Sequence, residues 1–242
     1  MGRGSSGQIG NSGQRWRTEK KAFGSDGKEI DLSRSPLRYS DDDKTVQGKV
    51  RSTIEKFEKL RATNKIEFAR TVDANGDIIE DNRGGRGSVK TSVRALNQAD
   101  TFTHNHPRSA GVIGGTFSVA DINNFANYGV RVYRAAASEG TYSISKGKKF
   151  DSAGLKNYYK QVSEAAANGA KARNASAKAE YDKVKNSYNA GKATYQQYES
   201  AWSKYNSDIT RSNNKMLVDL HNGLISGQKK YGYTYTLERR KK

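Results

Sequence analysis

Residues 103–121 contain two of the three histidines of this chain and one of its two prolines. On an extended segment side chains alternate between faces, so His104 and His106 project in the same direction. Pro107 cannot donate a ladder hydrogen bond and therefore ends the strand. The next predicted helix brings back the carboxylate of Asp121. Two imidazoles and one carboxylate form an open site that suits Zn²⁺ with a bound water, and we expect the function to reside here.

Each member of this group also has a simpler interpretation. The histidines could be polar residues at a strand end, and Asp121 could be only a helix-capping carboxylate. Ser118 is most simply an N-cap, with Asp121 three residues on in a spacing like that of a capping box. Their combination favours a metal site, because one carboxylate can both cap a helix and bind an ion.

The composition restricts the kinds of site and partner. The 242 residues include no cysteine, so a transition metal must be held by histidine and carboxylate, and a reducing compartment fits. The net charge is +18, and half of this excess lies in residues 151–242. The charge indicates either a polyanionic partner such as DNA or a solvated lysine-rich surface. No apolar run is long enough to span a bilayer, so we expect no membrane partner and a cytoplasmic location.

Hydrophobic periodicity predicts the elements around the site. Residues 45–62 have the three- and four-residue spacing of an amphipathic helix. Residues 66–72 and 77–80, joined through Asn75-Gly76, are typical of a β-hairpin. Short strands are predicted at 89–93, 101–106, 130–135 and 141–145, with a helical turn at 94–99 and a helix that starts after Ser118 and ends at Gly129. Residues 231–237 are predicted to form a last strand that returns to the sheet.

Between about residues 154 and 227 alanine, lysine, asparagine and tyrosine dominate, and turn signals are confined to 168–169 and 189–191. This pattern predicts two long helices packed as an antiparallel hairpin. Aromatic residues recur at helical spacing, and they could form a helix–helix seam, which we favour, or a stacking platform for bases. The fold class is therefore α+β: a mixed, curved sheet flanked by helices, with an α-helical hairpin inserted before the last strand.

Thr103-His104-Asn105-His106-Pro107, a loop, and then Phe117-Ser118-Val119-Ala120-Asp121-Ile122 follow the pattern His-x-His-Pro…Ser-x-x-Asp. This pattern resembles the signature of the JAMM/MPN (JAB-type) zinc metalloproteases. It is most similar to the RadC-like branch and to JAB-type domains of phage and prophage proteins. The resemblance covers about residues 50–145, plus the final strand.

The resemblance implies roles for single residues. His104, His106 and Asp121 would bind Zn²⁺, and Ser118 would support the oxyanion. Glu67, at the head of the first sheet strand, matches the family's general acid/base best. Glu80, on the second strand, is its rival.

Composition and periodicity, together with the resemblance for the central part, divide the chain into four parts. We expect a flexible basic segment at 1–45, a JAB/MPN-like metal-binding domain at 46–150, a helical arm at 151–228, and a returning strand with a basic tail at 229–242. The loop between Pro107 and Ser118 has ten residues, longer than the seven common in the eukaryotic enzymes, and its glycines suggest a flexible flap.

The predicted function is a zinc-dependent peptidase or isopeptidase, phage- or prophage-associated, in which a zinc-bound water attacks an amide carbonyl. Its location would be the host cytoplasm or a virion. The alternative is a non-catalytic JAB-fold structural or DNA-associated module of a virion or nucleoprotein assembly, and a toxin-type hydrolase stays open. An HNH-nuclease site is rejected, because that motif spreads its residues over a ββα unit. His221, in a helical stretch, is expected to be a surface or packing residue.

Overall fold

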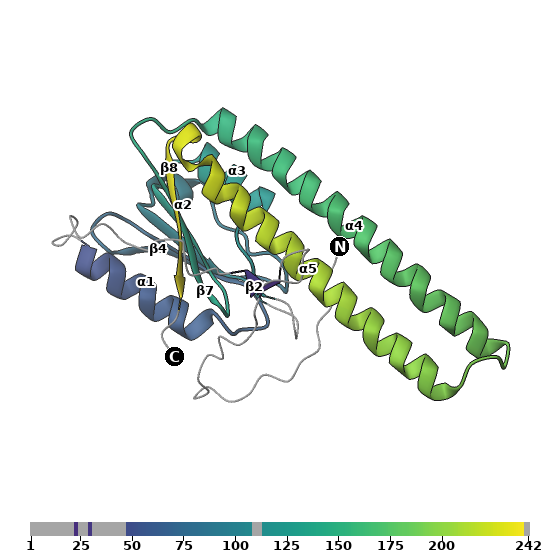
Figure 1. Cartoon of the computed structure of the whole chain (residues 1–242). Coiled ribbons are helices and arrows are strands. Elements are labelled where there is room, and N and C mark those ends of the chain that lie inside the picture. Colours follow the sequence, from purple (N-terminus) through teal and green to yellow (C-terminus); the bar gives the residue numbers. More distant parts are fainter. Residues whose placement is uncertain (1–21, 24–28, 31–46, 108–112, 240–242) are drawn as a thin grey trace.

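The chain folds around one mixed sheet of six strands, in the order β4-β3-β5-β6-β7-β8 (Figure 1). All neighbouring strands are antiparallel except β5 and β6, which are parallel. The computed structural model describes residues 22–23, 29–30, 47–107 and 113–239. The strands of the sheet are β3 (Phe68–Val72), β4 (Ile78–Arg83), β5 (Thr101–Asn105), β6 (Val132–Ala136), β7 (Gly140–Lys146) and β8 (Tyr233–Arg239).

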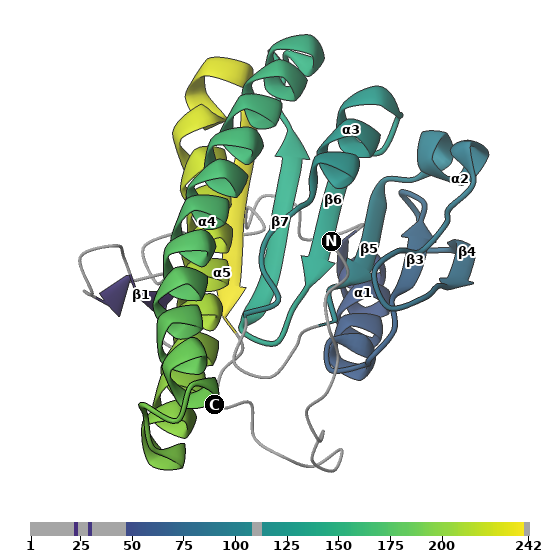
Figure 2. The ribbon, with the colours of Figure 1, turned by 90° about the vertical axis from the view of Figure 1, so that its right-hand side faces the viewer.

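Helices cover both faces of the sheet. Figure 2 shows α1 behind the sheet and the pair α4–α5 in front of it, with α3 in front of β6. A further two-stranded sheet, β1–β2, pairs antiparallel, and β1 lies against α5. The bounds are α1 (Gln47–Arg61), α2 (Val93–Gln98), α3 (Val119–Asn127), α4 (Ser152–Asn189), α5 (Tyr195–Tyr231), β1 (Ala22–Phe23) and β2 (Glu29–Ile30).

The predicted α+β class is confirmed, and so is the insertion of a helical hairpin, α4–α5, between β7 and β8. The amphipathic helix at 45–62 appears as α1, which buries Val50, Ile54 and Phe57. The predicted β-hairpin is the antiparallel pair β3–β4, with Gly76 at a φ of 85° in the turn. The strand predicted at 89–93 is wrong. Residues 84–92 are irregular there, because Ser92 instead caps α2 and accepts a hydrogen bond from the Ala95 amide.

Side-chain alternation on β5 and β6 separates two environments. Thr103 and Arg134 face α1, where both donate to the buried carboxylate of Glu58. His104 and Tyr133, one position along each strand, face α3, and their rings lie 5.6 Å apart. The sheet therefore carries a buried ionic cluster on one face and the candidate site on the other.

The helical hairpin belongs to the main core through the half nearest the sheet. Leu155 and Tyr159 of α4 and Leu217 and Leu224 of α5 are buried in the same cluster as the strands. A methyl group on Gly223 would lie 2.5 Å from Val162, so glycine lets the two helices approach closely. Asn168-Gly169 does not interrupt α4. The turn falls at 190–194, and Thr194 then starts α5 with a capping box.

Several predictions concern residues outside the described part of the chain. They are the flexible segment at 1–45, apart from β1 and β2, the tip of the loop at 108–112, and the final basic residues 240–242. Within the described residues, no helix combines the length and the apolar character needed to cross a bilayer.

Candidate metal centre

The two predicted histidine ligands lie at the end of β5 with their imidazoles turned toward α3. Both are buried, with 2% and 4% of their surface exposed for His104 and His106. His104 Nδ1 donates to the carbonyl oxygen of Arg134 at 2.9 Å, and His106 Nδ1 donates to that of Gly115 at 3.1 Å. A carbonyl can only accept, so both neutral rings carry their proton on Nδ1. Both Nε2 lone pairs consequently point into the site.

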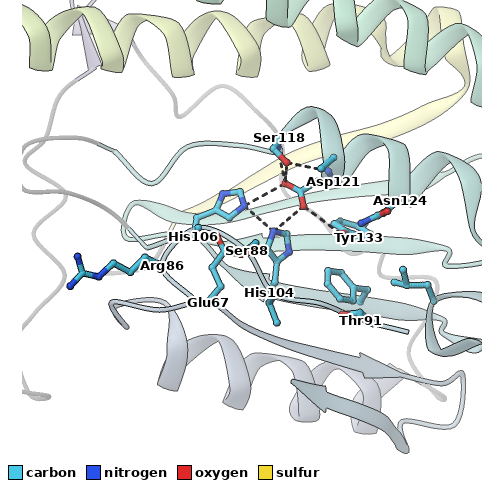
Figure 3. A pocket seen from close by; sticks show the side chains of 15 residues that line it. Glu67, Arg86, Ser88, Thr91, His104, His106, Ser118, Asp121, Asn124 and Tyr133 are labelled. Carbon is cyan, nitrogen blue, oxygen red and sulfur yellow. Dashed lines mark hydrogen bonds and ion pairs between the residues drawn. The ribbon is translucent and has the colours of Figure 1, made fainter. Parts of the chain in front are cut away.

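Asp121 comes to the same point from the first turn of α3. Its Oδ1 lies 3.3 Å from His104 Nε2 and its Oδ2 lies 3.6 Å from His106 Nε2. The carboxylate is fixed from behind, because Ser118 donates to Oδ2 from both its amide and its hydroxyl, each at 2.7 Å. The Ser118 hydroxyl accepts in turn from the Asp121 amide and completes a capping box. Asp121 therefore caps α3 and faces the imidazoles at once (Figure 3).

The electrostatics of this group favour a bound cation. The two Nε2 atoms lie 2.8 Å apart, although each is the lone-pair side of its ring when neutral. Burial alone would raise the pKa of the Asp121 carboxyl, but imidazoles that carry a second proton outweigh it through their charge and hydrogen bonds and hold that pKa well below its usual value. Two lone pairs and a carboxylate turned toward one point need a positive charge between them, either protons or a metal ion.

The donor set also fits a metal ion in its spacing. One ligand atom from each of the three residues lies within 4.8 Å of the others. Zinc bonds of about 2.0–2.1 Å in tetrahedral geometry separate ligand atoms by about 3.3 Å. The observed separations of 2.8, 3.3 and 3.6 Å lie on both sides of that value. His104, His106 and Asp121 could therefore bind a metal ion and leave one coordination position open.

Glu67 lines the same cavity as the three candidate ligands. The cavity has a volume of about 590 Å³, and Glu67 is 8% exposed. In Figure 3 Asp121 lies above the two imidazoles and Glu67 lies below them. Apolar side chains form part of the wall, and a substrate side chain could lie against them; they are Val89, Leu96, Phe102 and the ring of Tyr133.

Glu80, the rival of Glu67, is turned elsewhere. Its Oε2 accepts from the amide and the hydroxyl of Ser92, at 3.1 and 2.9 Å, at the start of α2. Burial alone would raise the pKa of Glu80, but hydrogen bonds from Asn82 and Ser92 lower it. Glu80 is not part of the cavity wall. His221 is a packing residue, as expected, because it is buried on α5 and its Nδ1 lies 2.7 Å from the Tyr235 hydroxyl.

Asn105, between the two histidines, has a role that the sequence did not reveal. It is completely buried, its Oδ1 accepts from the Phe68 amide at 2.6 Å, and its Nδ2 donates to the Ile66 carbonyl at 3.0 Å. These two backbone groups flank Glu67. The Asn105 side chain therefore takes the place of backbone–backbone hydrogen bonds between β3 and β5 at this point. It fixes the backbone that carries Glu67.

Tyr133 was also missed by sequence reasoning. Its hydroxyl lies 3.5 Å from Asp121 Oδ1, within the cavity wall. Burial, and then the charge of Asp121, raise the pKa of this hydroxyl well above its usual value. The phenol therefore stays protonated beside the carboxylate. Its alternating apolar context, typical of a core strand residue, gave no signal of this place.

The described part of the expected flap, residues 113–117, is buried and anchored. Ile113 donates its amide to Asn214 of α5, at 3.0 Å, and the hydroxyl of Tyr159 of α4 donates to the Phe117 carbonyl. Glu139 accepts from the amides of Gly114 and Gly115 at 2.9 and 2.8 Å. Gly115 has a φ of 84°, which favours glycine, and this conformation presents its carbonyl to His106. The helical hairpin thus supports the segment between the two parts of the site.

Comparison with known proteins identifies no relative. Neither a known protein family, nor a characterised protein, nor a solved structure matches this chain.

Proposed function

We propose that the chain is a zinc-dependent peptidase or isopeptidase of the JAMM (JAB) type. One observation carries the proposal: both Nδ1 atoms donate to backbone carbonyls, so both Nε2 lone pairs meet the Asp121 carboxylate in a cavity that Glu67 also lines. The pattern His-x-His-Pro…Ser-x-x-Asp supports the same class. A phage or prophage origin, and a host cytoplasmic or virion location, belong to this proposal through the resemblance alone.

The roles of the chain's own residues follow from their positions. His104, His106 and Asp121 would hold the ion, and the two carbonyl acceptors fix the tautomers that this requires. When bound, the ion would supply Lewis acidity, which lowers the pKa of a water ligand toward neutrality and polarises a substrate carbonyl. Glu67 would accept the proton of that water and deliver it to the leaving amine.

Ser118 has two possible contributions. Its hydroxyl proton is directed at Asp121, so its first role is to hold this ligand in place. The oxyanion role implied by the resemblance would require the hydroxyl to turn toward the substrate. Loss of an oxyanion donor costs about 3–4 kcal/mol of transition-state stabilisation.

The first test is metal content. Protein purified without added zinc should contain close to one equivalent of zinc by elemental mass spectrometry, and His104→Ala and His106→Ala should lose it. His221→Gln is the matched control, because it alters the third histidine, which lies on α5 away from the cavity. Zinc loss in all three variants alike would contradict the assignment of ligands.

The second test is the general base. A mixture of peptides and isopeptides should be cleaved by the zinc-loaded protein, as detected by mass spectrometry. Glu67→Gln should abolish cleavage and retain zinc, whereas Glu80→Gln should remain active. Zinc retention without any cleavage by the unaltered protein would favour the second candidate, a non-catalytic module of a nucleoprotein assembly. The exposed aromatic and basic residues of the helical hairpin favour that candidate.

A further inference from the structure

The outer half of the helical hairpin extends beyond the sheet, and there α4 and α5 lie side by side (Figure 1). Beyond Ala170, the buried residues of α4 are only Ala177 and Tyr181. On α5 the buried residues begin at Ser212, so the stretch from Tyr195 to Arg211 contains none. This half contributes little to the core, and its residues are available for another role.

Six aromatic residues form a continuous row along this outer half. The row consists of Tyr181, Tyr188, Tyr195, Tyr198, Trp202 and Tyr205, and neighbouring ring centroids lie 5.1–6.4 Å apart. The expected helix–helix seam is confirmed for Tyr181, which is buried and bonds the Tyr198 hydroxyl at 3.0 Å. Three rings remain open to solvent, since Tyr195 is 59%, Trp202 46% and Tyr188 37% exposed. A seam alone does not account for these three.

The charges around the row are unbalanced. Residues 171–215 contain nine lysines and arginines and four acidic residues. Every one of these acidic side chains already has a partner in the hairpin: Glu180 with Lys204, Asp182 with Lys178, Asp208 with Lys204 and Arg211, and Glu199 with the Tyr195 hydroxyl.

Two of these basic residues, Lys185 and Lys192, lie next to the exposed rings. Within the described residues, Lys185 and Lys192 form no ion pair with an acidic side chain. Lys185 is three residues before Tyr188, on the same side of α4, and Lys192 lies in the turn that precedes Tyr195. Both lysines are exposed. Positive charge therefore accompanies the accessible aromatic faces.

We propose that this outer half of the hairpin binds single-stranded nucleic acid. Unpaired bases would stack on the exposed rings of Tyr188, Tyr195 and Trp202, and the lysines would contact phosphates. A duplex keeps its base faces stacked and offers its backbone and base edges instead, so it should bind less tightly. The proposal is independent of the metal centre and of the peptidase function.

Trp202 provides a direct reporter of stacking. The chain has one other tryptophan, Trp16, so a Trp16→Phe background leaves Trp202 as the single tryptophan, which can be excited apart from the tyrosines. Titration with an oligothymidylate or an oligouridylate should quench its fluorescence at low salt. The affinity should fall with salt by a slope of about 0.7 per phosphate contact. Binding without quenching, or equal affinity for a duplex of the same length, would mean charge attraction alone and would overturn the proposal.

Two pairs of variants separate stacking from charge, with anisotropy of a labelled oligothymidylate as the measurement. Tyr195→Leu/Trp202→Leu should weaken binding about tenfold or more, whereas Tyr195→Phe/Trp202→Phe should stay within about threefold. Lys185→Ala/Lys192→Ala should weaken binding and lower the salt slope by about 1.4. Lys148→Ala/Lys149→Ala removes the same charge from the exposed loop before α4 and should change the affinity less.

Circular dichroism of each variant checks that the helices are intact. Unchanged affinity in the leucine pair would refute the site. Sedimentation equilibrium tests whether a second copy of the chain covers the row of aromatic residues instead. A dimer of the unaltered protein that the leucine pair dissociates, without oligonucleotide binding, would assign the surface to a second copy of this chain.

Discussion

The carbonyl oxygen of Arg134 accepts the Nδ1 proton of His104 at 2.9 Å, and the side chain of the same arginine lies on the opposite face of the sheet. There its guanidinium donates to Glu58 at 2.6 and 2.9 Å and to Glu238 at 2.9 Å. Arg134 is 1% exposed and Glu58 is 3% exposed. One residue thus links the orientation of a candidate ligand to a buried ionic cluster beneath α1.

Removal of one partner from this cluster should destabilise the fold strongly. Arg134→Met leaves the Glu58 carboxylate buried without its guanidinium, and such losses cost about 3–5 kcal/mol. Urea denaturation should report this change in the free energy of unfolding. The double variant Glu58→Leu/Arg134→Met should be less destabilised than Arg134→Met alone, because it leaves no unpaired charge on Glu58. A double variant that is as unstable as the sum of the two single variants would contradict this account.

The side chain of Asn105 should control catalysis without contributing a ligand. Asn105→Leu keeps the side-chain volume but removes both bonds to the backbone around Glu67. A displacement of a catalytic group by about 1 Å can cost about a hundredfold in rate. We therefore expect a large fall in kcat with zinc content and zinc affinity retained.

Asn97→Leu is the matched control for this variant. The Asn97 amide oxygen also accepts from a backbone amide, that of Gly129, but Asn97 does not bond the backbone around Glu67 and is not part of the cavity wall. Its turnover should be close to that of the unaltered protein. An Asn105→Leu variant that loses zinc together with activity would assign Asn105 to the support of the histidines instead.

The affinity for zinc should fall on acidification because of the imidazoles and not because of Asp121. Burial would raise the pKa of Asp121, but the imidazoles lower it well below its usual value, so this ligand stays ionised as the pH falls. A proton on Nε2 would occupy the lone pair that binds metal, so protons compete with zinc for the two rings. Competition with a chromophoric chelator should show an affinity that has already fallen before the pH reaches the ordinary carboxylate range near 4. A fall that starts only near pH 4 would indicate the carboxylate.

Zinc removal should lower thermal stability through the same residues. A ligand that binds only the folded state adds about 4 kcal/mol when its free concentration is a thousandfold above its Kd. Dipicolinate should therefore lower the Tm of the zinc-loaded protein, and added zinc should restore it. His106→Ala should show neither change. An equal effect of the chelator on that variant would place the metal elsewhere.

The sequence predicted the grouping of the candidate ligands, but not the residues that support this group. His104, His106, Ser118 and Asp121 lie within 18 residues, where strand alternation and helix capping determine how their side chains point. These local rules are sufficient to bring them together. Glu67 came from the resemblance, and its presence in the cavity wall depends on the pairing of β3 with β5, which no local rule determines.

The residues that support the segment at 113–117 come from distant parts of the chain. Tyr159 reaches the Phe117 carbonyl from 42 residues away, and Asn214 reaches the Ile113 amide from 101 residues away. In the sequence both residues appear as ordinary members of helical patterns. The strand predicted at 89–93 was wrong for a similar reason. Val89 is apolar but packs against the core as part of an irregular segment that lines the cavity.

The contact between the helical hairpin and residues 113–117 gives the most specific prediction, because α4 carries two adjacent tyrosines with different partners. The Tyr159 hydroxyl donates to the Phe117 carbonyl, next to Ser118, whereas the Tyr158 hydroxyl donates to the Gly223 carbonyl of α5 at 2.9 Å. Tyr159→Phe leaves a buried carbonyl without its partner beside the residue that holds Asp121. Loss of a direct hydrogen-bond partner of a ligand weakens metal binding about 10–100-fold, and loss of this support, one step further from the ligand, should weaken it by less but measurably. Tyr158→Phe removes the same atom from the same helix and should leave zinc affinity unchanged.

Both variants should lose some stability, since each removes a hydrogen bond of about 0.5–1.5 kcal/mol. Zinc affinity separates them, because only the Tyr159 hydroxyl supports the segment between the two parts of the site. Isothermal titration of the metal-free proteins with zinc measures the difference directly. If the two variants bind zinc equally, the hairpin stabilises the fold without positioning the candidate ligands, and its contribution to the site is limited to packing.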